Sequence, residues 1–170
     1  MSIRTGAEVG LDVLCHPPEA LGADRIANAV AAVDRWGSPV IIVDFGTATT
    51  FDVINSDGAY VGGSILPGVE ISAQALADRA AKLPAISLRI PDKAIGTTTI
   101  GSLESGIILG TASAIDGLAA KIVEEMDGQP RIIATGGLGA VFAQACKSIE
   151  LYDSNLTLDG LKICWERTRA

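Results

Sequence analysis

The spacing of hydrophobic positions changes along the chain, and each change predicts a new secondary-structure element. Residues 24–37 repeat apolar side chains every three or four positions, which is typical of a helix packed on one face. Residues 39–45 are almost continuously apolar, as in a strand that is covered on both faces. Residues 50–54 and 59–66 are predicted as two further strands, joined by the turn-forming sequence Asn-Ser-Asp-Gly. The first part of the chain therefore predicts a helix followed by a three-stranded meander.

The rest of the chain is predicted to be mostly helical, with short strands between the helices. Helices are expected at 69–82, 97–126, 139–147 and from 157 onward, and strands at 86–90, 131–135 and 149–152. The segment 97–126 is one long helix or two, and it contains Gly106, Gly110 and Gly117. Because glycine costs a helix about 1 kcal/mol relative to alanine, another backbone is expected to approach there, either within the chain or from a second subunit. The order of elements predicts an α/β domain with a mixed sheet.

Composition and charge narrow the classes of function. Hydrophobic residues make up 48% of the chain, which is enough to bury a sizeable core. The net charge of −7 argues against nucleic-acid binding, which normally needs a basic surface. A single histidine, His16, and three cysteines without metal-ligand spacing argue against a histidine triad, a zinc site or a disulfide framework. The lack of a signal-peptide pattern and the shortness of the longest uncharged run, 105–115, predict a cytoplasmic protein with no membrane partner.

Asp44 is the first candidate for chemistry, because it ends the apolar run 39–45. A carboxylate in a buried strand is unfavourable unless it is paired or binds a cation. The following residues, Gly-Thr-Ala-Thr-Thr at 46–50, offer backbone amides and hydroxyls that suit phosphate oxygens. The alternative is an aspartate that caps its own turn, followed by threonines that favour a strand.

Asp24 and Arg25 lie at the start of the first predicted helix. Asp24 can accept the proton of a substrate hydroxyl, or it can simply stabilise the helix dipole. Arg25 can bind a substrate anion through two parallel N–H groups. The helix taken alone favours the stabilising role.

Gly136 and Gly137 form a turn between a predicted strand and a predicted helix. In α/β sheets such a turn lets a nucleotide lie against the backbone at a helix N-terminus. A tight turn that needs positive φ would have the same sequence.

The chain resembles the type III pantothenate kinases over nearly its whole length. The matching segments, in order, are GADRIANAVAA from Gly22, IIVDFGTATTFDVI from Ile41, GGSILPGV from Gly62, AKLP from Ala81, TTTIGSLESGI from Thr97 and ATGG from Ala134. The resemblance implies the acetate-and-sugar-kinase, hsc70 and actin fold, an actin-like ATPase domain with a ribonuclease H-like mixed sheet. It also implies ATP-dependent phosphorylation of pantothenate to 4′-phosphopantothenate, the first step of coenzyme A biosynthesis.

The resemblance implies a role for each candidate residue. Gly22, Ala23, Asp24 and Arg25 match the pantothenate-binding motif of the family, in which Asp24 is the proton acceptor. Thr99 matches a further pantothenate contact, and family members are homodimers whose substrate pocket lies at the subunit interface.

The nucleotide and cation sites are implied in the same way. The residues expected to bind ATP are Gly46, Thr47, Gly136 and Gly137. Asp44 matches the aspartate that binds a monovalent cation, potassium or ammonium, and Mg²⁺ is expected to bridge the phosphates.

Two features depart from the family pattern. The family opens with a strand and a D-x-G-N-T phosphate loop that has no match before Gly22, and Leu103-Glu104 stands where the family often has Met-Gln. The expected organisation is a remnant of the first lobe and hinge at residues 1–37, followed by the second actin-like kinase domain at 38–170. The chain is then a shortened kinase or a non-catalytic relative that binds a ligand or assists transcription. The presence of Asp24, Arg25, Asp44 and Thr99 together favours the kinase.

Overall fold

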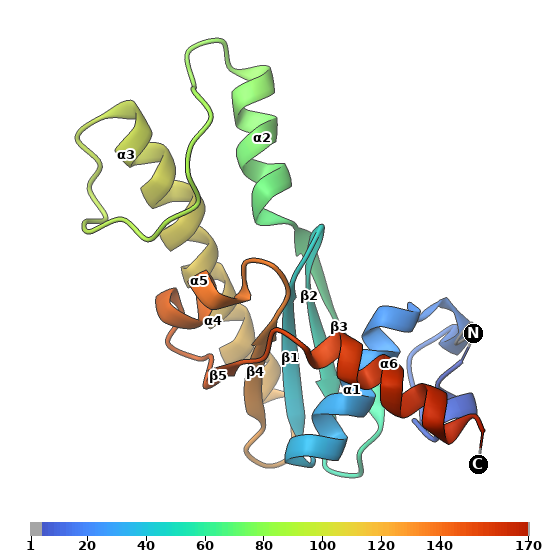
Figure 1. Cartoon of the computed structure of the whole chain (residues 1–170). Helices are drawn as coiled ribbons and strands as arrows, with labels where there is room; N and C mark the ends of the chain where they lie inside the picture. The colour runs from blue at the N-terminus through green and yellow to red at the C-terminus, as the bar shows by residue number, and fades with distance from the viewer. Residues whose placement is uncertain (1–4, 170) are drawn as a thin grey trace.

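A five-stranded mixed sheet runs through the computed structural model, which describes residues 5–169 (Figure 1). The strands are β1 (Val40–Phe45), β2 (Ala48–Ile54), β3 (Tyr60–Pro67), β4 (Arg131–Thr135) and β5 (Leu151–Tyr152). Their spatial order is β3-β2-β1-β4-β5. The first three strands are antiparallel neighbours, whereas β4 runs parallel to β1 and β5 runs parallel to β4. The predicted meander and the mixed sheet are both confirmed.

Helices cover both faces of this sheet (Figure 1). They are α1 (Ala23–Trp36), α2 (Val69–Arg79), α3 (Thr99–Glu104), α4 (Gly110–Glu124), α5 (Gly139–Ala145) and α6 (Leu156–Arg167). Two short 3₁₀ helices precede α1, η1 (Gly6–Val9) and η2 (Pro18–Ala20), and a π-helical segment, η3 (Ser105–Leu109), joins α3 to α4. The predicted long helix therefore exists as one continuous element with an irregular turn inside it.

The central strand β1 is buried on both sides because its side chains alternate between two cores. Val40 and Ile42 pack with α1 and α6, whereas Ile41 and Val43 pack with α4 and α5. The apolar run in the sequence predicted this double burial, and the structure confirms it.

Helices α1 and α6 pack closely side by side on one face of the sheet (Figure 1). A side chain at Gly160 of α6 would overlap the carbonyl group of Ala27, so glycine allows this close approach. Arg35 of α1 also donates hydrogen bonds to Asp153 and to Asp159 of α6. The start of α1 is thereby fixed over the sheet, and residues 5–37 share a core with it. A domain boundary at residue 37 stays a prediction.

The segment between α2 and α3 differs from the prediction. Residues 80–98 contain no helix or strand, so the strand expected at 86–90 is wrong, and α2 ends at Arg79 rather than at residue 82. Side chains of α3 and η3 hold the segment instead: Arg89 Nε donates to Glu104 Oε1 at 3.0 Å, and Ser105 Oγ donates to the Ala94 carbonyl at 2.5 Å. Ile86 and Leu88 face α2 across a pocket, and the sheet contains no strand from this segment.

The glycines of the long helix face open space in this chain. Among residues 5–169, no neighbouring atom outside the backbone of the helix itself lies within 4 Å of a Cβ placed on Gly106, Gly110 or Gly117. The prediction that another part of the same chain packs on these glycines is therefore wrong. A second subunit as their neighbour stays a prediction.

Within the described residues, the continuous helix Thr99–Glu124 is long and apolar enough to cross a membrane by length and composition alone. The expectation of no membrane partner rested partly on the uncharged run 105–115, which is shorter than the helix. Glu104 and Asp116, which bound that run, lie within the helix rather than at its ends. One face packs on the sheet through Ile108, Ala112 and Ile115. Only 22% of the most apolar stretch is buried, so the other face is uncovered in this chain.

Candidate active site

Three loops meet at the carboxyl end of β1. The turn that follows β4 is tied to this end because Leu138 N donates a hydrogen bond to the Phe45 carbonyl at 3.4 Å. A side chain at Gly68, the residue before α2, would overlap the carbonyl of Thr47. The carboxyl ends of neighbouring parallel strands are where α/β sheets usually bind ligands. This edge of the sheet is therefore the candidate active site.

Asp44 lies at the centre of this edge and is partly buried. Its Oδ2 accepts a hydrogen bond from Asn28 Nδ2 at 3.0 Å, and Asn28 Oδ1 accepts one from Thr157 Oγ1 at 2.7 Å. Burial raises the pKa of Asp44, the bond from Asn28 opposes this effect, and the negative charge of Asp24 adds to it. A cation bound beside Asp44 would relieve the burial of this negative charge.

Gly136 lies directly against Asp44. A Cβ on Gly136 would lie 2.5 Å from Asp44 Oδ1, and φ at this residue is +88°. Both facts require glycine here, as expected for a tight turn. The neighbouring Gly137 is exposed and has open space on its Cβ side, which leaves its backbone accessible to a ligand.

Gly46 and Thr47 are exposed between β1 and β2. Gly46 N donates to the Ala48 carbonyl at 3.1 Å, which closes a tight turn directly after Asp44. The Thr47 side chain is available at the surface, between the start of α2 and the end of β1.

Asp24 is exposed in the first turn of α1, and its Oδ1 accepts a hydrogen bond from Arg25 N at 2.9 Å. A Cβ on the N-cap residue Gly22 would lie 2.5 Å from the same oxygen, so glycine leaves room for the carboxylate over the helix start. Ala23 is the first residue of the helix and is also exposed. A substrate hydroxyl can therefore reach Asp24 from solvent.

Arg25 points the other way, toward β2 and β3. Its Nε donates to Asp52 Oδ1 at 2.6 Å, its Nη2 donates to the Phe51 carbonyl at 3.1 Å, and its guanidinium lies 5.8 Å from the centre of the Tyr60 ring. Burial disfavours the guanidinium charge, but Asp52 and Tyr60 outweigh this effect, so the pKa of Arg25 is raised. Arg25 and Tyr60 line a pocket of about 200 Å³ together with Gly62 and Gly63.

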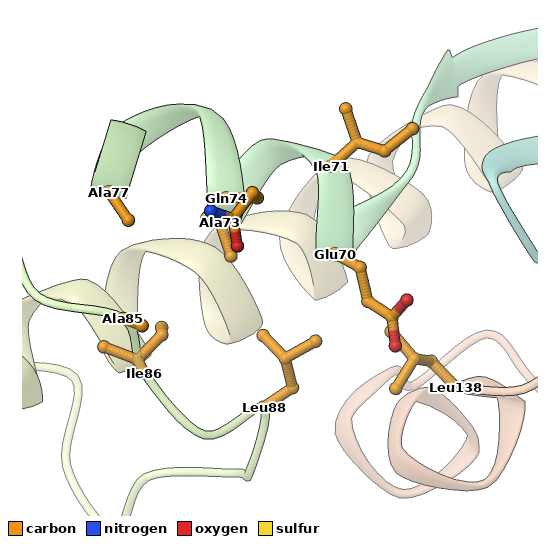
Figure 2. Close-up of a pocket in the computed structure, with 9 residues that line it drawn as sticks. All are labelled: Glu70, Ile71, Ala73, Gln74, Ala77, Ala85, Ile86, Leu88 and Leu138. Atoms are coloured by element: carbon orange, nitrogen blue, oxygen red, sulfur yellow. The ribbon is translucent and has the colours of Figure 1, made fainter. Parts of the chain in front are cut away.

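A larger pocket of about 610 Å³ lies between α2 and the segment 85–88, and it ends at Leu138, directly after the glycine turn (Figure 2). Figure 2 shows the side chains of Glu70 and Leu138 close together at one end of this pocket. Its walls are apolar, with Ile86 and Leu88 opposite α2, and Glu70 and Gln74 supply polar groups. Apolar walls with a few polar groups suit a flat heteroaromatic ring.

Thr99 is the one predicted site residue that the structure places elsewhere. It is exposed at the start of α3, and Figure 1 shows α3 at the opposite end of the chain from α1. The other predicted residues lie around the end of β1 or at the start of α1. Within one chain, Thr99 and Asp24 do not share a site.

Sequence reasoning missed three polar residues that organise the site, Asn28, Asp52 and Tyr60. Asn28 follows Asp24 by one helical turn on an otherwise apolar face, which was a usable signal. Asp52 interrupts the apolar positions of a predicted strand, and a buried charge in such a strand implies a partner. The identity of that partner could not be found without the packing of α1 on the sheet.

Comparison with known proteins gives the same assignment as the motifs. A sequence profile of the type III pantothenate kinases matches residues 1–121. A type III pantothenate kinase of Koribacter versatilis is 46% identical over 168 residues, covering 99% of this chain and 61% of the relative. One of Desulfatibacillum aliphaticivorans is 50% identical over 161 residues, covering 94% of this chain and 63% of the relative. The chain thus spans a little over three fifths of the length of these two relatives.

Solved structures support the fold. A Campylobacter jejuni protein described as a Baf family transcriptional activator superposes with a TM-score of 0.67 at 26% identity, covering 97% of this chain and 72% of that one. Component A of the (R)-2-hydroxyglutaryl-CoA dehydratase of Acidaminococcus fermentans superposes with a TM-score of 0.50 at 12% identity. The superposition covers 88% of this chain and 70% of that one. The second likeness concerns the fold alone and agrees with the actin-like ATPase domain expected from the sequence. From the profile match and these relatives, the chain belongs to the type III pantothenate kinase family.

Proposed function

We propose that this chain carries out the ATP-dependent phosphorylation of pantothenate to 4′-phosphopantothenate, the first step of coenzyme A biosynthesis. The observation that supports this most is the arrangement at the end of β1. There an exposed carboxylate, Asp24, lies near a partly buried one, Asp44, which is packed against the Gly136 turn. Family membership supplies the identity of the substrate.

Asp24 is proposed to accept the proton of the terminal hydroxyl of pantothenate. It is exposed in the first turn of a helix, where a substrate hydroxyl can reach it. Phosphoryl transfer passes through a loose transition state that needs positioning more than strong proton abstraction, so an exposed carboxylate is sufficient. Gly22 and Ala23 keep the approach to this carboxylate open.

Arg25 is proposed to bind the carboxylate of pantothenate from its pocket beside Gly62 and Gly63. Thr99 would contact the same substrate from a second copy of the chain, because it is too far from Asp24 within one copy. This requirement supports a homodimer with a shared substrate pocket. We also propose that the dimer is cytoplasmic.

ATP is proposed to bind along the loops at the end of β1. The exposed Gly46 and Thr47 and the open backbone of Gly137 would contact the phosphates. Because Leu138 leads from this turn into the pocket of about 610 Å³, the adenine ring would lie there against α2.

The residues present fit a monovalent cation at Asp44. Among the described residues, no group of three or more His, Cys, Asp or Glu side chains gathers as a metal site. Asp44 offers one carboxylate, and the Phe45 carbonyl oxygen lies close to the same Gly136 turn. Such oxygens would suit K⁺ or NH₄⁺. Mg²⁺ prefers several waters together with phosphate oxygens, so ATP would carry it into the site, where it would neutralise phosphate charge.

The proposal is tested by the release of ADP from ATP with Mg²⁺ and K⁺, with and without pantothenate. We expect pantothenate-dependent release by the wild type and a decrease of about a hundredfold in Asp24→Asn, the range for loss of a general base. The matched control is Asp34→Asn, an exposed aspartate of the same helix, which should leave the rate unchanged. Equal rates for wild type and Asp24→Asn would exclude the proposed mechanism.

A non-catalytic relative is the second candidate, favoured by the superposition with the Campylobacter jejuni protein that carries a transcriptional activator name. Such a protein would bind pantothenate without releasing ADP. Calorimetric titration of pantothenate beside the ADP assay separates the two functions.

A further inference from the structure

Asp52 of β2 is a fully buried carboxylate with an unusual set of partners. Its exposed fraction is 0%, and its Oδ1 accepts hydrogen bonds from Arg25 Nε at 2.6 Å and from Tyr60 Oη at 2.8 Å. Its Oδ2 is buried and has no hydrogen-bond partner among the described residues. One oxygen is therefore shared by two donors while the other receives none.

Fold stability does not explain this arrangement. A buried carboxylate loses its hydration, and an unpaired buried oxygen adds a further cost. Burial raises the pKa of Asp52, although Arg25 and Tyr60 oppose that effect. Replacing a buried ion pair by apolar side chains is often neutral or stabilising. We therefore infer that Asp52 has a role other than stabilising the core.

The contacts of Arg25 show what Asp52 does. Asp52 and the Phe51 carbonyl together hold one edge of the guanidinium, and the Tyr60 ring lies beside it. The Nη1 atom has no hydrogen bond to any described residue, and the side chain is 19% exposed at the pocket of about 200 Å³. The charged group is thus fixed on its inner edge and free on its outer edge.

Gly63 of β3 keeps this arrangement compact. A Cβ on Gly63 would overlap the Phe51 carbonyl and lie 3.1 Å from Arg25 Nη2. Only a residue without a side chain therefore lets Arg25 reach the carbonyl and Asp52 together.

We propose that Asp52, assisted by Tyr60, is a positioning residue that fixes Arg25 so that its outer edge binds the carboxylate of the substrate. This inference rests on the proposed function, because pantothenate supplies that carboxylate. A planar guanidinium held on one edge presents its remaining N–H groups in a fixed direction, which suits a planar carboxylate.

The test compares the affinities of pantothenate and pantothenol, in which an alcohol replaces the carboxylate. Both are titrated calorimetrically in the presence of an unreactive ATP analogue. We expect the preference for pantothenate to fall about tenfold in Asp52→Asn, as for loss of a charge-assisted hydrogen bond, and about threefold in Tyr60→Phe. A purely structural role would weaken both ligands equally and leave their ratio unchanged. An unchanged or increased preference in both variants would overturn the proposal.

Two further variants act as controls. Arg25→Gln should abolish the preference, and the double variant with Asp52→Asn should lose nothing more, because Asp52 acts through Arg25. Asp116→Asn alters a different carboxylate, one that accepts hydrogen bonds from Lys147 N and Ser148 Oγ away from the site. It should keep the wild-type ratio, and an additive double variant would contradict the inference.

A second readout is independent of pantothenate. The Nε–H group of Arg25 should give a slowly exchanging signal in a nitrogen-edited NMR spectrum, identified by its loss in Arg25→Gln. We expect this signal to shift and exchange faster in Asp52→Asn, and to a lesser degree in Tyr60→Phe if the first variant does not fold. A protected signal without pantothenate binding would leave Asp52 holding Arg25 while refuting the proposed function. An unprotected wild-type signal would refute the positioning role itself.

Discussion

Asp44 shows how a single residue can be kept at a cost to stability. Its carboxylate is partly buried beside Gly136, has one hydrogen bond from Asn28, and is repelled by Asp24. Active sites often contain groups that are not optimal for stability, because ligand binding needs them charged. The raised pKa makes this conflict measurable.

We expect Asp44→Asn to be more stable than the wild type at neutral pH without K⁺. The pKa of Asp44 is raised in the folded state above its ordinary value of 3.8. At pH values between the unfolded and the folded pKa, folding therefore takes up a proton. The free energy of unfolding falls as the pH rises through that window. A gain of about 1 kcal/mol would raise Tm by roughly 2–4 °C in a domain of this size.

Thermal unfolding as a function of pH measures this difference. It should be largest at neutral pH and vanish below the unfolded pKa, and K⁺ should raise the Tm of the wild type only. A variant that is less stable than the wild type at neutral pH would contradict this view of Asp44.

At the residue scale, the sequence singled out Asp24, Arg25 and Asp44 as candidates, but it missed Asn28, Asp52 and Tyr60 and did not show how the candidates are held. Asp24, Arg25 and Asp44 stand out through their place at a helix start or a strand end. The contacts that organise them join Asn28 to Asp44 and Arg25 to Asp52, pairs that only the packing of α1 on the sheet brings together.

The helix formed by α3, η3 and α4 is the element whose environment is least complete. Gly106, Gly110 and Gly117 have no neighbours within 4 Å of a Cβ, and most of the apolar stretch is uncovered. An uncovered apolar face of this size marks an interaction surface in a globular protein. The proposed homodimer would cover it.

We predict that the chain is a dimer in solution and that Gly110→Gln weakens it. A Cβ at this position meets no neighbouring atom of the described residues, and the substitution improves helix propensity by up to about 1 kcal/mol, so the monomer should not be destabilised. Light scattering during size-exclusion chromatography should report about twice the 17.4 kDa of the chain for the wild type and less for the variant.

Lys162→Gln is the control, an exposed position of α6 on the other face of the sheet, and it should leave the dimer intact. A monomeric wild type, or a Gly110→Gln variant that is as dimeric as the wild type, would rule out this interface.

Most elements could be predicted because their hydrophobic periods are long and clear. The segment 86–90 could not, because its three alternating apolar residues suit a strand, whereas no edge of the sheet is available to pair with it. The end of α2 was misplaced for a related reason: helix propensity continues past Arg79, but the chain turns toward α3 instead.

The whole molecule has the mixed sheet that sequence pattern and family likeness predicted, whereas the spatial order of its strands and the packing of helices on both faces became known only from the structure. What the pattern could not supply is that α1, which carries Asp24 in its first turn, and α3, which begins with Thr99, lie at opposite ends of the molecule (Figure 1). A pantothenate site that uses both must be built from two copies.

Mixing two inactive variants, Asp24→Asn and Thr99→Ala, tests this shared kinase site most directly. Each mixed dimer would hold one site with an intact Asp24 and an intact Thr99. Random exchange should therefore restore formation of 4′-phosphopantothenate, measured by mass spectrometry, to about a quarter of the wild-type rate. A mixture no more active than the two variants measured separately, with the dimers shown to exchange, would contradict a site shared between two chains.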